Sequence, residues 1–330
     1  MSLPTVMRAL QQTSLNGPKD LRLVTDVPVP VPGRGQILVR VSAAGVNYAD
    51  ISQAHGTFGG GPQPPYLAGF EAAGEVVAVG EGVIGIDRGA HIIGVAFGAF
   101  AEYVAIPQIT VVPIPPGWSD EQALGMVVNW PTALAALKYL GQLDRGQTVL
   151  IHAAAGGTGQ AAVKIAKHYG ATVIATASPD KHETVKALGV DHILDSRGPD
   201  IAAEVKRLTS GAGVDLVLES VGGATFDTSL AIAKRVTGKV IVTGLPAGKA
   251  TLSNWDLVYK HQVQIIGLNI GILAQSAPKM FGEIMGELFG LIAAGVLTPS
   301  QPTVYDLADG SKALAALESR ASVGKLALRP

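Results

Sequence analysis

The chain has 330 residues, 48% of them hydrophobic and 15% charged, and this amount of apolar material predicts two domains with sizeable cores. Its formal net charge is -1 and its pI about 6.7, so it lacks the basic surface that a nucleic acid or an anionic membrane would require. It contains no cysteine, which excludes disulfides, a thiolate nucleophile and any cysteine-containing zinc site.

Two apolar stretches, 92–101 and 265–274, are the longest in the chain. Both contain glycine and are shorter than the roughly 18 residues that suggest a membrane span, so we interpret them as core or interface strands. No basic segment followed by an apolar run and a cleavage site is visible near the N-terminus, and we therefore expect a cytoplasmic protein.

The first third of the chain alternates short β-rich runs with clusters of glycine and proline, a pattern typical of a small β-rich domain. Similar short runs return near the C-terminus, after a break at Gly295 and Pro299. We therefore assign 1–121 and 298–330 to one domain, with an irregular loop at 59–65. The expected strands include 36–41, 75–79, 103–106, 303–306 and 325–328.

The middle of the chain, 122–297, alternates strands and helices, which predicts a parallel, doubly wound α/β sheet of the Rossmann type. The expected strands are 148–151, 172–176, 192–194, 214–218, 239–243 and 263–270. The expected helices are 131–140, 158–169, 184–188, 201–208, 226–233 and 279–294.

A glycine loop joins the first of these strands to the following helix. The sequence Thr148-Val-Leu-Ile-His-Ala-Ala-Ala-Gly-Gly-Thr-Gly159 permits a tight turn and lets a pyrophosphate approach the helix N-terminus, whose N–H groups and dipole stabilise negative charge. Because a strand precedes the loop and a helix and second strand follow it, the motif predicts dinucleotide binding. A purely structural turn is the alternative.

The end of the second strand predicts a preference for NADPH. Ser178 and Lys181, with Arg197, can face a 2′-phosphate, whereas no acidic side chain ends the strand, because Asp180 follows a proline and is expected in the next helix. In the alternative interpretation Ser178 caps that helix and Lys181 is solvated. Glu219, at another strand end, is an uncommitted acid/base candidate.

Four motifs carry a wider resemblance, and they occur in the order Ala43–Asp50, Leu67–Gly74, Ala153–Gly159 and Ser220–Gly223. Over nearly its whole length the chain resembles the medium-chain dehydrogenase/reductase superfamily, and within it the zinc-free, zeta-crystallin-like quinone oxidoreductase branch. The resemblance implies a GroES-like catalytic domain beside the Rossmann domain.

The same resemblance implies a metal-independent enzyme. Zinc-containing members have a cysteine at the place of Asn47 and a histidine at that of Phe70, so two metal-binding positions are lost here. The seven histidines have no ligand-like spacing, and we expect most of them on the surface or in loops.

We place Asn47, Tyr48 and Asp50 beside the nicotinamide as catalytic candidates, with Tyr48 as the hypothetical proton donor to a developing enolate oxygen. The alternative is that Tyr48 only lines the cleft and solvent supplies the proton. Many quinone oxidoreductases have a tyrosine where this chain has Ser52. The expected cofactor-binding residues are Asn47, Thr132, Ala155, Gly156, Gly157, Thr158, Gly159, Ser178, Lys181, Arg197, Gly244, Leu245, Asn269 and Lys325.

A local similarity to the enoyl reductase domains of polyketide and fatty-acid synthases places Lys181 and Asp200 at positions considered there for proton delivery. The preferred interpretation is NADPH-dependent hydride transfer to a quinone or an α,β-unsaturated carbonyl compound, because these acceptors need no metal. A free-standing enoyl reductase and a non-enzymatic, crystallin-type NADPH-binding protein remain alternatives.

The strand expected at 263–270 has neither proline nor charge and should form an exposed sheet edge with apolar side chains. A two-fold partner strand would satisfy both its backbone and its side chains, and the resembled reductases commonly dimerise there. The sequence thus predicts a homodimer.

Overall fold

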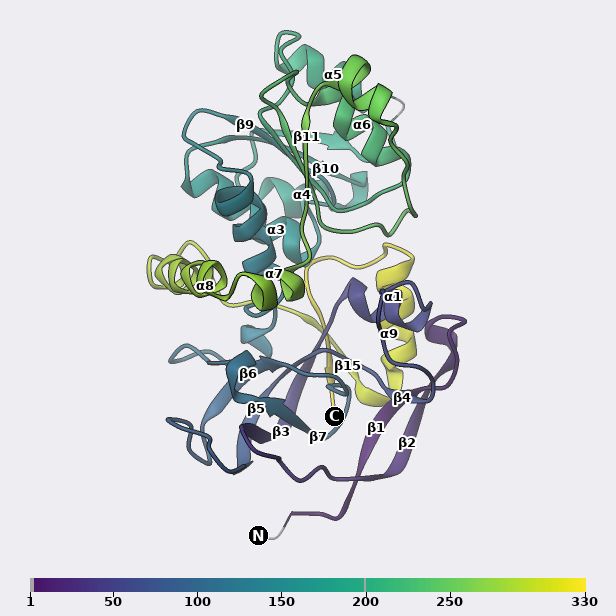
Figure 1. Ribbon diagram of the computed structural model, residues 1–330, viewed down its shortest axis with the longest axis vertical. Helices are drawn as coiled ribbons and strands as arrows, with labels where there is room; N and C mark the ends of the chain where they lie inside the picture. The colour runs from purple at the N-terminus through teal and green to yellow at the C-terminus, as the bar shows by residue number, and fades with distance from the viewer. Residues whose placement is uncertain (1–2, 199) are drawn as a thin grey trace. The chain divides into compact units, whose positions relative to one another are not determined.

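The computed structural model describes residues 3–198 and 200–330 (Figure 1). The chain divides into two compact units, one formed by Met1–Val127 with Pro299–Pro330 and the other by Val128–Thr298. The boundary expected at 121 and 122 lies inside the first unit. The segment beyond it stays there because the Gly125 N–H donates to the Glu71 carboxylate and the Ser300 N–H donates to the Gln122 carbonyl.

Unit 1 contains a seven-stranded sheet in the order β15-β16-β3-β5-β6-β8, with β7 also paired to β3, and a three-stranded sheet in the order β2-β1-β4. Its strands are β1 (Val6–Gln12), β2 (Leu21–Pro28), β3 (Gln36–Val46), β4 (Tyr66–Leu67), β5 (Glu71–Val79), β6 (His91–Val95), β7 (Tyr103–Pro107), β8 (Val111–Pro113), β15 (Thr303–Asp306) and β16 (Leu326–Arg329). Its α-helices are α1 (Tyr48–Ala54) and α9 (Gly310–Glu318), which contact each other (Figure 1).

The pairing of β16 with β3 positions part of the site. Leu326 lies opposite Val46 and Ala327 opposite Gly45 in an antiparallel register, so the residue before β16 reaches the residue after β3. Buried apolar side chains from both strands and from α9 belong to one core, which fixes this register.

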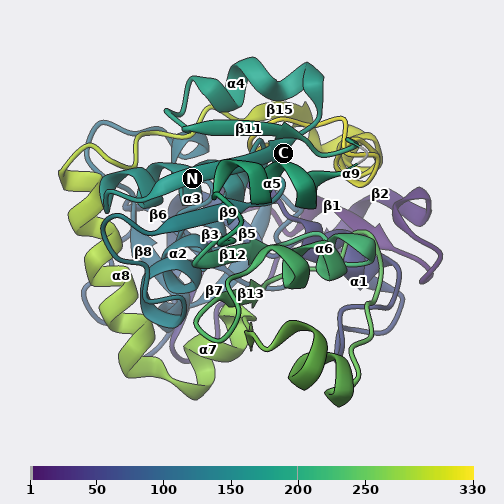
Figure 2. The same cartoon turned by 90° about the horizontal axis from the view of Figure 1, so that it is seen from above.

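Unit 2 contains a six-stranded parallel sheet in the order β11-β10-β9-β12-β13-β14, the Rossmann order that the sequence predicts. Its strands are β9 (Thr148–Ile151), β10 (Thr172–Ala177), β11 (His192–Asp195), β12 (Leu216–Glu219), β13 (Lys239–Val242) and β14 (Gln264–Gly267). Its α-helices are α2 (Asn129–Leu134), α3 (Gly157–His168), α4 (His182–Lys186), α5 (Ile201–Leu208), α6 (Ala224–Ile232), α7 (Ile270–Ser276) and α8 (Pro278–Ala293). Helices α5 and α6 contact each other (Figures 1 and 2).

Three expected elements differ in the structure. The apolar stretch 92–101, interpreted as a strand, is strand only as far as Val95, where β6 ends and a turn with Gly98 at positive φ follows. The strand expected at 263–270 ends at Gly267, because Asn269 caps α7 by accepting the N–H groups of Gly271 and Ile272. The apolar stretch 265–274 is therefore strand only as far as 267 and helix from 270. The helix expected at 131–140 is α-helical only in α2 and continues as a π-helix over Ala135–Leu140.

Among the described residues, no helix is both long and apolar enough to cross a membrane.

Candidate functional site

The glycine loop after β9 leads directly into α3, which begins at Gly157. A Cβ at Gly159 would lie 2.4 Å from the Ala153 carbonyl oxygen, so only glycine fits the close passage of helix and strand. At Gly156 a Cβ would meet no atom closer than 3.4 Å, so the space beside this residue is open. A ligand can therefore approach the backbone of the loop at this point. Ala155 to Gly159 thus form a helix N-terminus with the shape and dipole that suit a pyrophosphate.

Asn129, at the start of α2, is a neighbour of this loop that the sequence motif did not indicate. Its Nδ2 donates to Thr158 Oγ1 at 3.1 Å and so fixes the hydroxyl at the N-terminus of α3. Thr132, an expected cofactor contact on the same helix, donates its hydroxyl to the Val128 carbonyl at 2.6 Å.

Ser178 and Lys181 follow β10, and their side chains are buried, with exposures of 7% and 8%. Burial is the main cause that lowers the pKa of Lys181; Asp180 opposes the shift, and Arg197 adds to it. Lys181 is therefore not a solvated surface residue. Ser178 stands at the N-cap position of the short helix Pro179–Lys181 but makes no capping hydrogen bond. Its hydroxyl instead lowers the pKa of Asp180.

Three other polar residues, one at a strand end and two at helix N-caps, have local structural partners. Glu219 is fully buried, which raises its pKa, and its carboxylate accepts the N–H groups of Val221 and Gly222 at 2.8 and 3.0 Å. Asp200 caps α5 through the Ala203 N–H at 2.8 Å, and Asn269 caps α7. These contacts hold turns and helix ends in place. Gly244 and Leu245 lie beyond Thr243, the residue that follows β13.

His152 is an exception to the expectation, which holds for five of the seven histidines, that most of them lie on the surface or in loops. It lies in the sheet core, 1% exposed, with Nδ1 at 3.1 Å from Thr176 Oγ1 and Nε2 at 3.1 Å from Ser229 Oγ. Burial lowers its pKa to about 4, so the ring is neutral at pH 7.

Unit 1 brings Asn47, Glu71 and Lys325 together in a buried polar cluster. The Lys325 ammonium donates to Asn47 Oδ1 at 2.7 Å and to Glu71 Oε2 at 2.6 Å. Asn47 Nδ2 donates to Glu71 Oε2 at 3.0 Å and to the Gly45 carbonyl at 3.1 Å, and Glu71 Oε1 accepts the Gly125 N–H at 2.6 Å. Glu71 is fully buried and Lys325 is 5% exposed. Sequence reasoning had singled out Asn47 and Lys325 but missed Glu71, which joins them.

Asp50 and Tyr48 lie on α1, directly after Asn47. Asp50 Oδ2 accepts the Asn47 N–H at 2.7 Å, whereas its Oδ1 is buried without a hydrogen-bond partner among the described residues. Burial, the largest cause, raises the pKa of Asp50 to about 7. Tyr48 is half-buried, and burial and then Glu318 raise the pKa of its phenol.

These side chains do not fit a catalytic zinc ion. Phe70 offers no donor atom, and its ring lies 5.2 Å from that of Phe58 and 5.3 Å from that of Phe97. Asn47 and Glu71 already hold an ammonium group, whose positive charge would repel a cation. Within the ranges 3–198 and 200–330, no group of three or more histidine, aspartate or glutamate side chains is placed to hold a metal ion.

Two family descriptions match parts of the chain. Residues 33–116 match the "alcohol dehydrogenase GroES-like domain", and residues 157–285 match the "zinc-binding dehydrogenase" family. The second match covers β10 to β14 of unit 2 but neither β9 nor the position of Phe70.

Solved structures match over almost the whole chain. The Escherichia coli quinone oxidoreductase complexed with NADPH is 30% identical, with a TM-score of 0.90 over 98% of this chain and 100% of that one. The CurK enoyl reductase is 28% identical, with a TM-score of 0.88 over 98% of this chain and 99% of that one.

A curated relative is much longer. The phthioceranic/hydroxyphthioceranic acid synthase of Mycobacterium tuberculosis is 33% identical over 299 residues, which are 90% of this chain and 14% of the synthase. The chain thus spans about a seventh of the length of that relative. Fold, site and comparisons agree, and the chain belongs to the medium-chain dehydrogenase/reductase superfamily, in its quinone oxidoreductase branch.

Proposed function

We propose that this protein is an NADPH-dependent reductase of quinones or α,β-unsaturated carbonyl compounds. The observation that carries the proposal is the glycine loop before α3 together with Ser178 and Lys181 beyond β10. The fold that holds them is similar to that of a quinone oxidoreductase complexed with NADPH. Bound NADPH supplies a hydride, which with one proton converts a quinone to a hydroquinone or saturates the activated carbon–carbon double bond.

In this proposal unit 2 binds the cofactor. Backbone N–H groups of Ala155 to Gly159 hold the pyrophosphate, while Ser178, Lys181 and Arg197 bind the 2′-phosphate. Residues beyond the other strand ends, and one on α2, complete the contact with the dinucleotide: Thr132, Gly244, Leu245 and Asn269.

In the same proposal, residues of unit 1 stabilise charge on the acceptor and supply its proton. Both amide hydrogens of Asn47 are engaged by Gly45 and Glu71, so Asn47 contributes by holding Lys325, whose charge stabilises negative charge that develops during reduction. Tyr48 donates the proton to the acceptor oxygen, and Asp50 fixes the start of α1 through the Asn47 N–H. Alcohol oxidation is disfavoured because the donor set does not suit a Lewis-acid metal.

Stopped-flow oxidation of NADPH with three acceptors tests the function: 1,4-naphthoquinone, an enone and an enoyl thioester. Turnover with the quinone or the enone is the expected result. Turnover with the thioester alone would favour an enoyl reductase. Tight NADPH binding without oxidation by any acceptor would overturn the proposal in favour of a non-enzymatic binding protein.

The enoyl reductase is the second candidate because of the similarity to CurK and to the mycobacterial synthase. One contact weighs against the proton delivery that this alternative assigns to Asp200. Its Oδ1 already accepts the Ala203 N–H as the cap of α5.

We further propose a homodimer that pairs two copies through β14. This strand lies at one edge of the six-stranded sheet, and its Ile266 is half-buried. The sequence led us to expect that this run exposes its apolar side chains, but Val263 and Leu268 are buried within their own chain. The proposal is therefore supported by the edge position of the β14 backbone and by Ile266, and not by Val263 and Leu268.

A further inference from the structure

Three phenylalanine rings form a continuous strip in unit 1, which we call the aromatic strip: Phe58, Phe70 and Phe97. Consecutive ring centroids are 5.2 and 5.3 Å apart, with interplanar angles of 45° and 51°. Phe70 is 9% exposed and Phe97 is 60% exposed, so the strip extends from the interior to the surface. Single exposed apolar residues are ordinary, but Phe97 continues a row of rings whose middle member, Phe70, directly precedes Glu71 in the chain.

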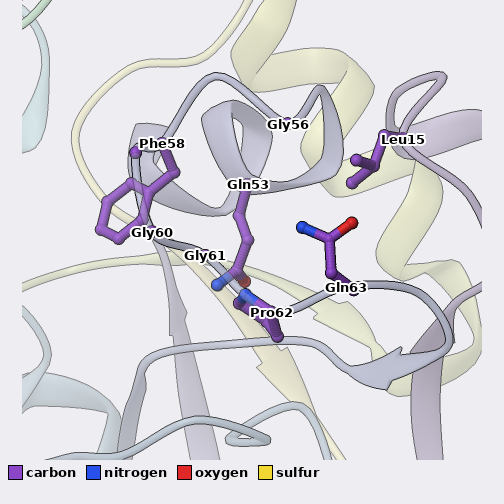
Figure 3. Close-up of a pocket in the computed structure, with 9 residues that line it drawn as sticks. Leu15, Gln53, Gly56, Phe58, Gly60, Gly61, Pro62 and Gln63 are labelled. Carbon is purple, nitrogen blue, oxygen red and sulfur yellow. The ribbon is translucent and has the colours of Figure 1, made fainter.

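A cavity of about 110 Å³ adjoins the strip, and Phe58 belongs to both (Figure 3). The cavity is lined by Leu15, Gln53, Gly56, Phe58, Gly59, Gly60, Gly61, Pro62 and Gln63. The loop approaches α1 closely at Gly61, where a Cβ would lie 3.7 Å from Gln53 Nε2. An engineered apolar cavity of about 150 Å³ holds benzene, so this one has room for a ring substituent and not for a whole ring.

Gln53 provides an unused donor in this cavity. Its side chain is 2% exposed and extends from α1 toward Gly61 and Pro62 (Figure 3). Gln53 Nε2 has no hydrogen-bond partner within the described part of the chain. A buried N–H group without an acceptor is costly, and an oxygen atom placed in the cavity would satisfy it.

We infer that the aromatic strip and Gln53 select the hydride acceptor, and that they favour a flat aromatic quinone carrying a small oxygen substituent. The rings would stack on the conjugated system, and Gln53 Nε2 would donate to the substituent oxygen. This inference rests on the proposed function and narrows it, because a linear enoyl chain gains neither stacking nor this hydrogen bond.

The test measures kcat/KM with NADPH for three acceptors: 2-methoxy-1,4-naphthoquinone, 1,4-naphthoquinone and a linear aliphatic enone. Phe97→Leu keeps an apolar side chain but removes the ring, and should lower the ratio of naphthoquinone to enone about tenfold. Gln53→Met keeps the length but removes the donor, and should lower the ratio of methoxy to unsubstituted quinone about tenfold. Ile109→Ala alters a residue of unit 1 that is 92% exposed and should change neither ratio.

Several outcomes would overturn the inference. Equal loss on all acceptors in Phe97→Leu, with a lowered melting temperature, would give the strip a structural role only. An unchanged methoxy preference in Gln53→Met would mean that the amide binds water. If the unmodified protein reduces the enone but neither quinone, the selection fails while the reductase function stands. If it oxidises NADPH with none of the three, the proposed function itself fails.

Discussion

Lys181 provides a direct test of the cofactor preference, because it is a buried cation beyond β10. Ser178 precedes it by three residues, and the charge of Arg197 acts on it. Lys181→Ala should raise the KM for NADPH about tenfold, as expected if one charged contact of roughly 1.5 kcal/mol is lost, and leave the KM for NADH unchanged. Lys186→Ala, on the exposed side of α4, is the matched control. Equal effects on both cofactors would show that Lys181 does not contact the 2′-phosphate.

The pair formed by Lys325 and Glu71 makes a second prediction. Lys325→Met leaves the Glu71 carboxylate buried without its countercharge and should reduce the free energy of unfolding by about 3–5 kcal/mol. Adding Glu71→Gln removes that charge and should restore most of the loss. Urea unfolding measures the stability of both variants. Lys312→Met, which removes the exposed ion pair between Lys312 and Asp309, is the control. A Lys325→Met midpoint equal to that of the control would contradict the prediction.

The sequence revealed individual residues of the site more readily than their partners. Asn47 could be chosen from its motif, but Glu71 and Lys325 are 254 positions apart, and only the pairing of β16 with β3 brings them together. Asn129 carries no motif at all, since its role follows from the packing of α2 against α3.

His152 connects three elements, because it stands after β9 and contacts Thr176 of β10 and Ser229 of α6. Its pKa is about 4 in the folded protein and about 6.5 when unfolded, so the unfolded chain binds an extra proton between these values. Its contribution to stability is therefore complete above pH 6.5 and is lost as the pH falls toward 4, by about 3 kcal/mol in total.

Thermal melting between pH 4 and 7 measures this contribution. The variant His152→Gln cannot titrate in this range and should show a flatter dependence of melting temperature on pH. His192→Gln, at the half-buried start of β11, is the control and should retain the slope of the unmodified protein. Identical slopes in all three proteins would exclude His152 as the titrating group.

Elements with a strong local pattern were predicted closely, and α5 has the bounds expected from the sequence. The strand predicted at 263–270 is longer than the observed β14, because the apolar residues continue into α7. Hydrophobicity alone does not separate a strand from a helix that follows it. Only the side chain of Asn269 marks the change. The π-helix at Ala135–Leu140 has no sequence signature, since its alanines and leucines equally suit an α-helix.

The proposed dimer is tested on the intact protein. Light scattering at micromolar concentration should give twice the chain mass of 33.8 kDa, and Ile266→Pro in β14 should reduce it to the mass of one chain. Ile193→Pro alters β11 at the opposite edge of the same sheet and should leave the dimer intact. Circular dichroism checks that both variants are folded. A single-chain mass for the unmodified protein would refute the dimer.

The ammonium of Lys325 also has a consequence for metal binding. A catalytic zinc ion here would need a thiolate at Asn47, an imidazole at Phe70 and the loss of Lys325. Loss of Lys325 alone leaves the buried Glu71 carboxylate without its countercharge, and a thiolate at Asn47 alone would lie against the ammonium. The cluster therefore resists conversion to a metal site by any single substitution among these residues.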